Sequence, residues 1–96
     1  MEMNNMDFAK LECIANRIRA IGHPQRIAII SLFNKDNKLT VSEILDKVNI
    51  DQATASNHLR ILRDQQVLAV TRSGRNKIYS LKNSTLDEVV SYLEEE

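Results

Sequence analysis

The chain has 96 residues, enough for one domain with a modest core, and its 43% hydrophobic and 27% charged residues are typical of a globular protein rather than a disordered one. It contains no run of roughly 20 apolar residues, no signal-peptide pattern and a single cysteine, so we expect a cytoplasmic protein without membrane spans or intrachain disulfides. The formal net charge of zero conceals a separation: residues 51–83 carry six Arg or Lys against two Asp, whereas residues 84–96 carry five acidic groups and no basic one, a pattern that favours a one-sided nucleic-acid-binding surface.

The N-terminal part of the chain is predicted to form two helices. We expect residues 1–6 to lack order, Asp7 to cap the first helix and Gly22 to end it in a left-handed conformation. An apolar stripe with a period of about 3.6 residues runs along this helix: Phe8, Leu11, Ile14, Ala15, Ile18 and Ile21. Pro24 suits the first turn of the second helix, which we expect to be central to the core. Its inward residues are predicted to be Ile27, Ile30 and Phe33, with Ile29 and Leu32 beside them.

After a polar turn at residues 34–38, residues 40–65 have the pattern of two short helices joined by a tight turn. Thr40 and Glu43 have the spacing of a capping box at the start of the first of these helices. Its apolar stripe consists of Val41, Ile44, Leu45 and Val48. Asp51 is a candidate cap for the second helix. The buried face of that helix is expected to consist of Ala55, Leu59 and Leu62.

The other face of this second helix carries polar side chains of an unusual kind. They are Gln52, Thr54, Ser56, Asn57, Arg60 and Arg63. The first turns lack the Glu and Lys pairs of a solvated helix and offer amides and hydroxyls instead, which are groups that bond base edges and phosphate oxygens. The pattern predicts a helix-turn-helix whose second helix enters the major groove of DNA.

After this pair of helices the pattern becomes that of a β-hairpin. Residues 67–72 and 77–81 are β-compatible runs on either side of a turn that contains glycine. Arg72, Arg75 and Lys77 flank the turn, and they supply charges that a phosphate contact needs and a solvated turn does not. The hairpin is therefore predicted to be a DNA-contacting wing.

Residues 84–95 are predicted to form a last helix, which would take part in dimerisation. Its apolar stripe consists of Leu86, Val89, Val90 and Leu93. The expected fold is mainly α with a small β-hairpin. It is a single winged helix-turn-helix domain of residues 1–96 with five helices and a two-stranded wing at residues 67–81.

In their order and spacing, three runs of the chain resemble those of the ArsR/SmtB type of arsenic- and metal-sensing winged-helix repressors. The runs are GHPQRIAII (residues 22–30), ASNHLRIL (residues 55–62) and VLAVTRSGRNKIYSL (residues 67–81). The resemblance implies a homodimeric repressor whose first and last helices pair, which binds two inverted half-sites in double-stranded DNA and which an effector releases. The apolar stripes of the two terminal helices independently favour a dimer. Its interface is expected to include Phe8, Leu11, Ile18, Leu86, Val89, Val90 and Leu93.

The candidate metal ligands depart from the pattern of the family's metal sensors. Those sensors carry paired cysteines on the helix that corresponds to residues 41–48, or acidic and histidine ligands on the last helix, and this chain has neither set. Zinc and soft metals need Cys and His ligands that converge, whereas Cys13, His23 and His58 are spread over three predicted elements. We therefore expect no metal site and no cofactor, and the effector is unknown.

DNA contacts are expected from nine side chains: Gln52, Thr54, Ser56, Asn57, His58, Arg60, Arg72, Arg75 and Lys77. Ser56 and Asn57 match positions that face DNA in the family. Asn57 is the strongest candidate for a base contact because its amide can pair with adenine N6 and N7. His58 is equally compatible with packing and hydrogen bonding inside the domain. The alternative for the whole set is ordinary solvent exposure.

Two alternative functions and one excluded class complete the sequence-based predictions. Cys13 lies on the first helix, where a lone cysteine is more often a small buried hydrophobe than a sensor, but two copies in a dimer would permit a thiol-based redox switch. The second alternative is a winged-helix module that binds protein, against which the positive charge of residues 51–83 argues. An enzyme is not expected, because there is no glycine-rich phosphate loop, metal-ligand cluster or nucleophile–base spacing.

Overall fold

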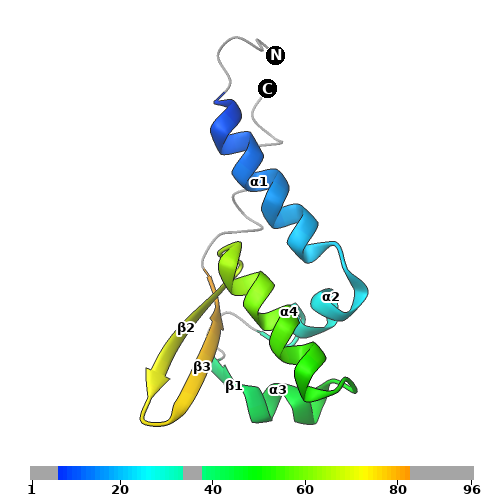
Figure 1. The fold of residues 1–96 in the computed structure, drawn as a ribbon, viewed down its shortest axis with the longest axis vertical. Helices are drawn as coiled ribbons and strands as arrows, with labels where there is room; N and C mark the ends of the chain where they lie inside the picture. Colours follow the sequence, from blue (N-terminus) through cyan, green and yellow to red (C-terminus); the bar gives the residue numbers. More distant parts are fainter. Residues whose placement is uncertain (1–6, 34–37, 83–96) are drawn as a thin grey trace.

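The computed structural model describes residues 7–33 and 38–82 and has a mainly helical fold with a small antiparallel sheet (Figure 1). The elements in chain order are α1 (Phe8–Ile21), α2 (Pro24–Ile30), β1 (Lys38–Thr40), α3 (Val41–Lys47), α4 (Gln52–Asp64), β2 (Leu68–Ser73) and β3 (Asn76–Leu81). The described part therefore holds four helices rather than the five expected, and the fifth, expected at residues 84–95, lies outside it. No helix within the described ranges is long and apolar enough to cross a membrane.

Helix α1 begins as predicted but ends differently. The Asp7 side chain accepts a hydrogen bond from the Lys10 backbone N–H at 3.2 Å, which confirms the cap. Gly22 follows the helix with φ −74° and ψ 48°, so the predicted left-handed conformation is wrong. The His23 N–H instead donates to the Ile21 carbonyl at 2.7 Å, which closes an inverse γ-turn around Gly22. Glycine suits this turn by its size, because a Cβ would lie 3.3 Å from the Ile18 carbonyl oxygen.

The apolar stripe of α1 is divided between the core and the surface. Ile14 is buried, whereas Phe8 and Ile18 are 60% and 48% exposed. Figure 1 shows why: α1 extends beyond the rest of the body, and only its C-terminal half lies close to α2 and α4. One side of α1 consequently presents large apolar side chains that nothing in the described part of the chain covers.

Helix α2 contributes to the core through a different face from the one predicted. Ile29 is fully buried and Phe33 nearly so, but Ile27 is 52% exposed, so its predicted inward position is wrong. At about 100° per residue, Ile27 and Ile29 lie about 160° apart around the helix, and only one of them can face the core. The buried core cluster comprises Ala20, Ile29, Phe33, Leu39, Ile44, Leu59, Leu62, Val67, Leu68 and Tyr79.

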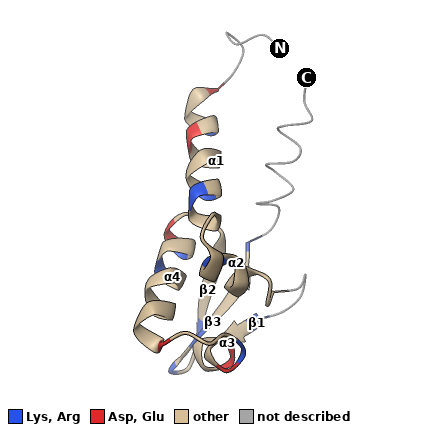
Figure 2. Ribbon diagram, turned by 90° about the vertical axis from the view of Figure 1, so that its right-hand side faces the viewer, with Lys and Arg blue, Asp and Glu red and all other residues tan. Residues whose placement is uncertain are grey.

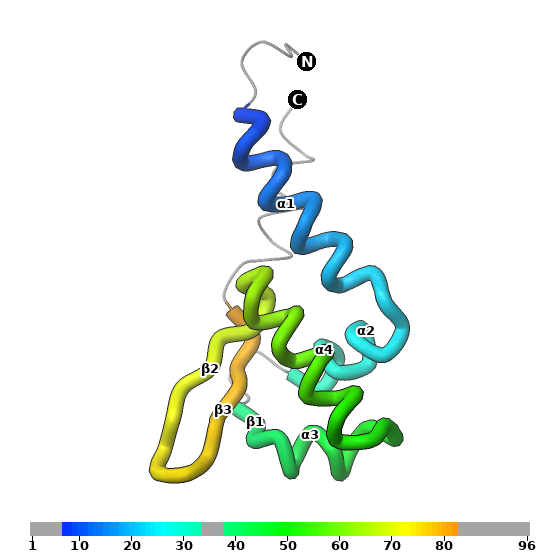
Figure 3. Tube along the Cα trace, in the orientation of Figure 1, coloured from blue at the N-terminus to red at the C-terminus, as the bar shows by residue number. Residues whose placement is uncertain are grey.

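The two helices of the helix-turn-helix begin at the predicted caps. The Thr40 hydroxyl accepts from the Glu43 N–H at 3.2 Å, while the Glu43 carboxylate accepts from the Thr40 N–H at 2.9 Å, which is the complete capping box. The hydrogen bond from the Thr40 backbone N–H, followed by that of the Thr40 side chain, holds the pKa of Glu43 below its ordinary value. Asp51 caps α4 by accepting from the Thr54 N–H at 3.0 Å. Figure 3 follows the chain from α3 through the turn into α4.

The sheet has three strands in the order β1-β3-β2, so the predicted two-stranded wing is corrected. The added strand, β1, pairs antiparallel with β3 and sets Leu39 opposite Tyr79, both of them buried. The sequence pattern does not reveal this strand, because three residues are too few for an alternating pattern and Lys38 belongs to the polar run that is predicted to be a turn. The β2–β3 hairpin itself forms as predicted, with Gly74 at φ 63° in its tip.

Helix α4 ends in a Schellman motif at Gln66. The Gln66 N–H donates to the Arg63 carbonyl at 2.9 Å and the Val67 N–H donates to the Leu62 carbonyl at 2.8 Å, which is the paired pattern of this cap. Gln66 adopts φ 61°, a conformation that usually belongs to glycine. Val67 and Leu62 are both buried, and they supply the apolar contact that accompanies this motif.

Candidate nucleic-acid interface

The two faces of α4 separate as the sequence predicts. Ala55, Leu59 and Leu62 are completely buried, so the opposite face of the helix points away from the core. Four of the predicted DNA-contacting side chains on this helix are exposed: Gln52, Ser56, Asn57 and Arg60. The outer face therefore presents amide, hydroxyl and guanidinium groups side by side, without an acidic side chain between them.

Thr54 is partly used within the protein. Its hydroxyl donates to Asp51 Oδ1 at 2.6 Å and its backbone N–H donates to Asp51 Oδ2 at 3.0 Å. The hydroxyl bond, followed by the backbone bond, holds the pKa of Asp51 below its ordinary value. Thr54 is half-buried and orients the start of α4.

Asn57 and Arg60 form a pair on the exposed face of α4. Arg60 Nη2 donates to Asn57 Oδ1 at 2.7 Å across one helical turn. An amide oxygen has two lone pairs, so Asn57 can accept this bond and still accept a hydrogen bond from a base. Both hydrogens of its amide nitrogen are still available to donate. Arg60 thus fixes the amide orientation of the side chain that is the strongest candidate for base recognition.

His58 lies inside the domain. Its side chain is 5% exposed, and its two ring nitrogens contact α2: Arg26 Nε donates to Nδ1 at 3.1 Å and Gln25 Oε1 lies 2.8 Å from Nε2. Burial of the ring, followed by the nearby His23 and Arg26, holds the pKa of His58 below its ordinary value. Of the two roles that the sequence left open, this placement favours the internal hydrogen-bonding role over direct DNA contact.

Gln25 and Arg26 are functional candidates that the sequence did not single out. Arg26 also donates from Nη1 to the Ala20 carbonyl at 3.2 Å, so it ties the end of α1 to α4 through His58. The Gln25 N–H donates to His23 Nδ1 at 3.1 Å, and the His23 and His58 rings lie 4.7 Å apart. Periodicity cannot reveal contacts between residues more than 30 positions apart. The only available signal was that the run at residues 22–30 carries three polar side chains beside a core helix.

The tip of the β2–β3 hairpin concentrates positive charge. Arg72 pairs directly with Lys77 across the hairpin, and Arg75 lies in the turn between the strands. Like charges at directly opposed positions are unfavourable, so this arrangement costs stability unless an anion offsets it. All three side chains are exposed, and no ion pair joins any of them to another group in the described part of the chain.

The tip of the β2–β3 hairpin and the N-terminal end of α4 lie at the same end of the molecule. In Figure 1 the hairpin tip, α3 and the N-terminal end of α4 all lie at the bottom, opposite the free end of α1. Figure 2 shows basic residues in blue at the hairpin tip beside α3. This arrangement gives a helix that can enter a groove and, beside it, a charged finger that can reach the adjacent phosphates.

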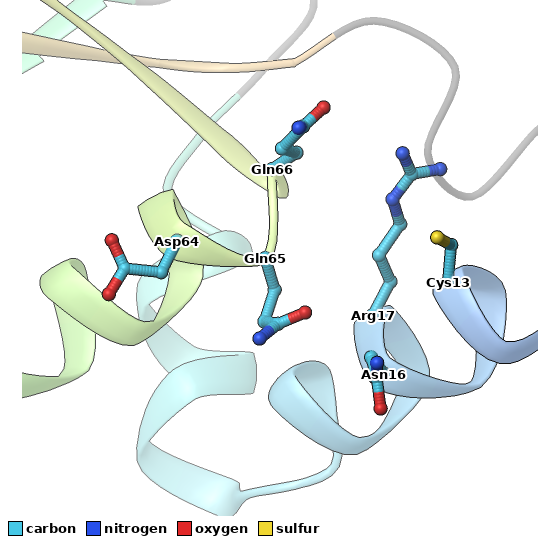
Figure 4. A pocket seen from close by; sticks show the side chains of 6 residues that line it. All are labelled: Cys13, Asn16, Arg17, Asp64, Gln65 and Gln66. Carbon is cyan, nitrogen blue, oxygen red and sulfur yellow. The ribbon is translucent and has the colours of Figure 1, made fainter.

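Cys13 is exposed, contrary to the expectation of a buried hydrophobe. It lines a surface pocket of about 180 Å³ between α1 and the end of α4, together with Asn16, Arg17, Asp64, Gln65 and Gln66 (Figure 4). At about 100° per residue, Cys13 lies about 140° around α1 from Phe8 and about 160° from Leu11. The thiol and the exposed apolar side of α1 therefore face different directions.

Among the described residues, no three His, Cys, Asp or Glu side chains come together as a metal site requires. Cys13 lies on α1, whereas His23 and His58 lie close to each other and both make hydrogen bonds within the protein. The acidic residues of the last predicted helix fall outside the described ranges, so the expected absence of a metal site stays a prediction.

Comparisons with known proteins bear on this arrangement. Residues 23–69 match the family described as bacterial regulatory protein, arsR family. The transcriptional repressor PagR of Bacillus anthracis is 28% identical over 90 residues, which cover 94% of this chain and 90% of PagR. The transcriptional repressor SdpR of Bacillus subtilis is 31% identical over 78 residues, which cover 81% and 86% of the two chains.

Two further likenesses agree with these. The HTH-type transcriptional repressor SmtB of Mycobacterium tuberculosis is 34% identical over 80 residues, which cover 83% of this chain and 58% of SmtB. The crystal structure of PagR superimposes with a TM-score of 0.77 at 28% identity, and the match covers 92% of this chain and all of that one. These names describe transcriptional regulators rather than enzymes, which supports the expectation of a non-enzyme.

Proposed function

Because this chain belongs to the ArsR family of bacterial regulatory proteins, we propose that it is a homodimeric, sequence-specific repressor in which α4 reads the major groove and the wing contacts phosphates. The family and its relatives support a DNA-binding transcriptional regulator. One observation carries the finer proposal: an exposed amide- and hydroxyl-bearing helix face lies at the same end of the molecule as three cations without a protein partner in the described ranges.

The roles of the DNA-contacting residues follow from the chemistry of their side chains. On α4, the amides and hydroxyls suit base edges, and the pair of Asn57 and Arg60 suits a purine. On the wing, the cations suit phosphates and carry no sequence information. The proposed interface consists of Gln52, Thr54, Ser56, Asn57, Arg60, Arg72, Arg75 and Lys77. His58 is proposed to act indirectly, through its hydrogen bonds to α2.

The proposed dimer rests on the exposed side of α1. Phe8 and Ile18 are large apolar side chains in open solvent, and Leu11 between them is half-buried. A domain this small gains stability when a second copy covers such a surface. The partner face is proposed to include Leu86, Val89, Val90 and Leu93, which lie outside the described residues. Twofold-related recognition helices roughly 34 Å apart would meet successive major grooves of an inverted repeat.

The absence of a metal requirement is part of the proposal, and so is release by an effector that is not yet identified. The alternative of a redox sensor draws support from the exposure of Cys13. Its position on α1, far around the helix from Phe8 and Leu11, argues against a disulfide across the proposed dimer interface. The dimeric repressor without a thiol switch is the function that the geometry supports best.

Selection of DNA by the purified protein tests this function. Duplexes recovered from a random library and sequenced are expected to share an inverted repeat whose half-sites lie about one helical turn apart. Binding to the selected duplex is expected to exceed binding to a scrambled duplex of the same composition and to weaken steeply as salt is added. Recovery of unrelated sequences, with equal binding to both duplexes, would reject the proposal.

A further inference from the structure

We propose that His58 is a positioning residue of the recognition helix, and that it holds α4 in its DNA-reading orientation only while the imidazole ring is neutral. The proposal rests on the proposed function of α4 and concerns how that helix is held. His58 lies one position after Asn57, about 100° further around α4, and is the buried polar residue among the described ones.

The hydrogen bonds of His58 are compatible with a single form of the ring. Arg26 Nε can only donate, so Nδ1 must accept and cannot carry a proton. The proton of the neutral ring then sits on Nε2, where it donates to Gln25 Oε1 at 2.8 Å. Both nitrogens are satisfied in this tautomer alone, and both partners belong to α2.

Protonation of His58 breaks this arrangement. A second proton would have to sit on Nδ1, where it would oppose the N–H of Arg26 and set two positive charges together. In the described part of the chain, the titratable and charged groups that act on the ring are Arg26 and His23 of the α2 N-terminus, and Gln25 is neutral. Burial and these two groups lower the pKa of His58, so the ring stays neutral near neutral pH.

A change at this contact reaches the DNA-reading face directly. Loss of the hydrogen bonds between His58 and α2 allows α4 to rotate or tilt, and Asn57 and Ser56, on the same helix, then move with it. Base recognition is more sensitive to such a displacement than phosphate contact is, because a side chain that recognises a base must place two hydrogen bonds on the base edge at once. Acidification is therefore expected to weaken selective binding more than non-selective binding.

The direction of the pH effect separates this proposal from a simple surface effect. A histidine near the phosphates gains positive charge as the pH falls and strengthens binding to any duplex. A buried histidine that positions the helix weakens binding to the selected duplex instead. We expect an affinity loss of about tenfold for the selected duplex between about pH 8 and about pH 5, and none for a scrambled duplex.

Two variants locate the effect, because the chain contains only two histidines. His58→Gln removes the titrating group and is expected to give a flat pH profile for the ratio of selected to scrambled binding. His23→Asn retains a side-chain acceptor at the start of α2 and is expected to keep the pH-dependent loss, with its midpoint moved to higher pH because His23 no longer lowers the pKa of His58. A flat profile in the wild-type protein, a loss that persists in His58→Gln, or a loss that disappears in His23→Asn would overturn the assignment.

A measurement on the wild-type protein without DNA keeps the test independent of whether His58→Gln folds. Imidazole nitrogen chemical shifts across a pH titration report both the tautomer and the midpoint. The expected result is the Nε2–H tautomer with a midpoint below the ordinary value of 6.5. The Nδ1–H tautomer, or a midpoint at or above that value, rejects the inference. Failure to select any duplex at any pH rejects the proposed function instead.

Discussion

Substitution of Asn57 gives the most direct test of the proposed recognition of DNA bases. Asn57→Ala removes the amide and is expected to reduce the preference for the selected duplex over a scrambled one by about 1–3 kcal/mol, because one bidentate base contact is worth about that much. Fluorescence anisotropy with both duplexes at one salt concentration measures the ratio. Arg63→Ala is a matched control on the same helix, since Arg63 pairs with Asp64 at the far end of α4. Equal losses on both duplexes would mean that Asn57 contacts the sugar–phosphate backbone of DNA and not a base.

Arg75 offers the opposite behaviour. Arg75→Ala removes one wing cation and is expected to weaken binding to selected and scrambled duplexes by the same factor, because phosphates carry no sequence information. The slope of the logarithm of affinity against the logarithm of salt concentration should fall by about one for each lost phosphate contact. Arg19→Gln removes the same charge from α1 and should leave both quantities unchanged. A larger loss on the selected duplex would mean that Arg75 reads a base.

Among the elements, the end of α4 contains an unusual backbone position. Gln66 adopts the left-handed conformation, which costs an ordinary residue about 1–2 kcal/mol and glycine little. Gln66→Gly and Gln66→Ala both remove the hydrogen bond that Lys82 Nζ donates to Gln66 Oε1, so they differ mainly in this cost. Urea unfolding is expected to find the glycine variant more stable than the alanine variant by about 1 kcal/mol. Equal stabilities would mean that the backbone at position 66 leaves the left-handed conformation in the alanine variant.

Elements with strong local signals could be predicted from the sequence. The capping box at Thr40, the caps at Asp7 and Asp51 and the hairpin around Gly74 all depend on residues within a few positions of one another. Such features need no knowledge of the rest of the fold, because the side chain satisfies a neighbouring backbone group in the isolated segment as well.

The features that could not be predicted depend on contacts across the fold. Strand β1 exists because β3 is available to pair with it, and Ile27 faces outward because Ile29, about 160° away around α2, faces the core. The proposed DNA-facing surface was recognisable from its polar pattern. The ties of His58 to Gln25 and Arg26 were not, since each joins positions that only the packing of α2 against α4 brings together.

At the scale of the whole molecule, three lowered pKa values predict how stability depends on pH. Burial lowers the pKa of His58, and hydrogen bonds from Thr40 and Thr54 lower those of Glu43 and Asp51. In each case the unfolded chain binds more protons than the folded one over the window between the two pKa values, so stability rises with pH there.

The expected loss on acidification therefore has two steps. The contribution of His58 is complete above 6.5 and decreases as the pH falls below it, whereas those of Glu43 and Asp51 decrease only below their ordinary values of 4.5 and 3.8. The free energy of unfolding, measured with urea across this range, should show both steps. His58→Gln should lack the first and retain the second, and a first step that survives in the variant would have to arise from another group.

The exposed side of α1 is the proposed dimer surface, and the proposed operator binding depends on that dimer. Ile18→Glu places a charge on this side and is expected to convert the dimer to a monomer in sedimentation experiments. Affinity for the selected duplex should then fall far more than affinity for a scrambled one, because two linked half-sites bind with a high effective concentration and separate domains do not. Ile27→Glu alters an equally exposed isoleucine on α2 and should leave the dimer intact.

Oxidation provides a second measure of the same dimer geometry. The Cys13 thiol faces away from Phe8 and Leu11 by about 140–160° around α1, so two copies that pair through the apolar side hold their thiols apart. A thiol oxidant should consequently give no disulfide-linked dimer on a non-reducing gel. Its effect on operator affinity, if there is any, should be the same in Cys13→Ser as in the wild-type protein. A rapid, quantitative cross-link would mean that α1 pairs through its other side, and the thiol switch would then replace the apolar contact as the basis of assembly.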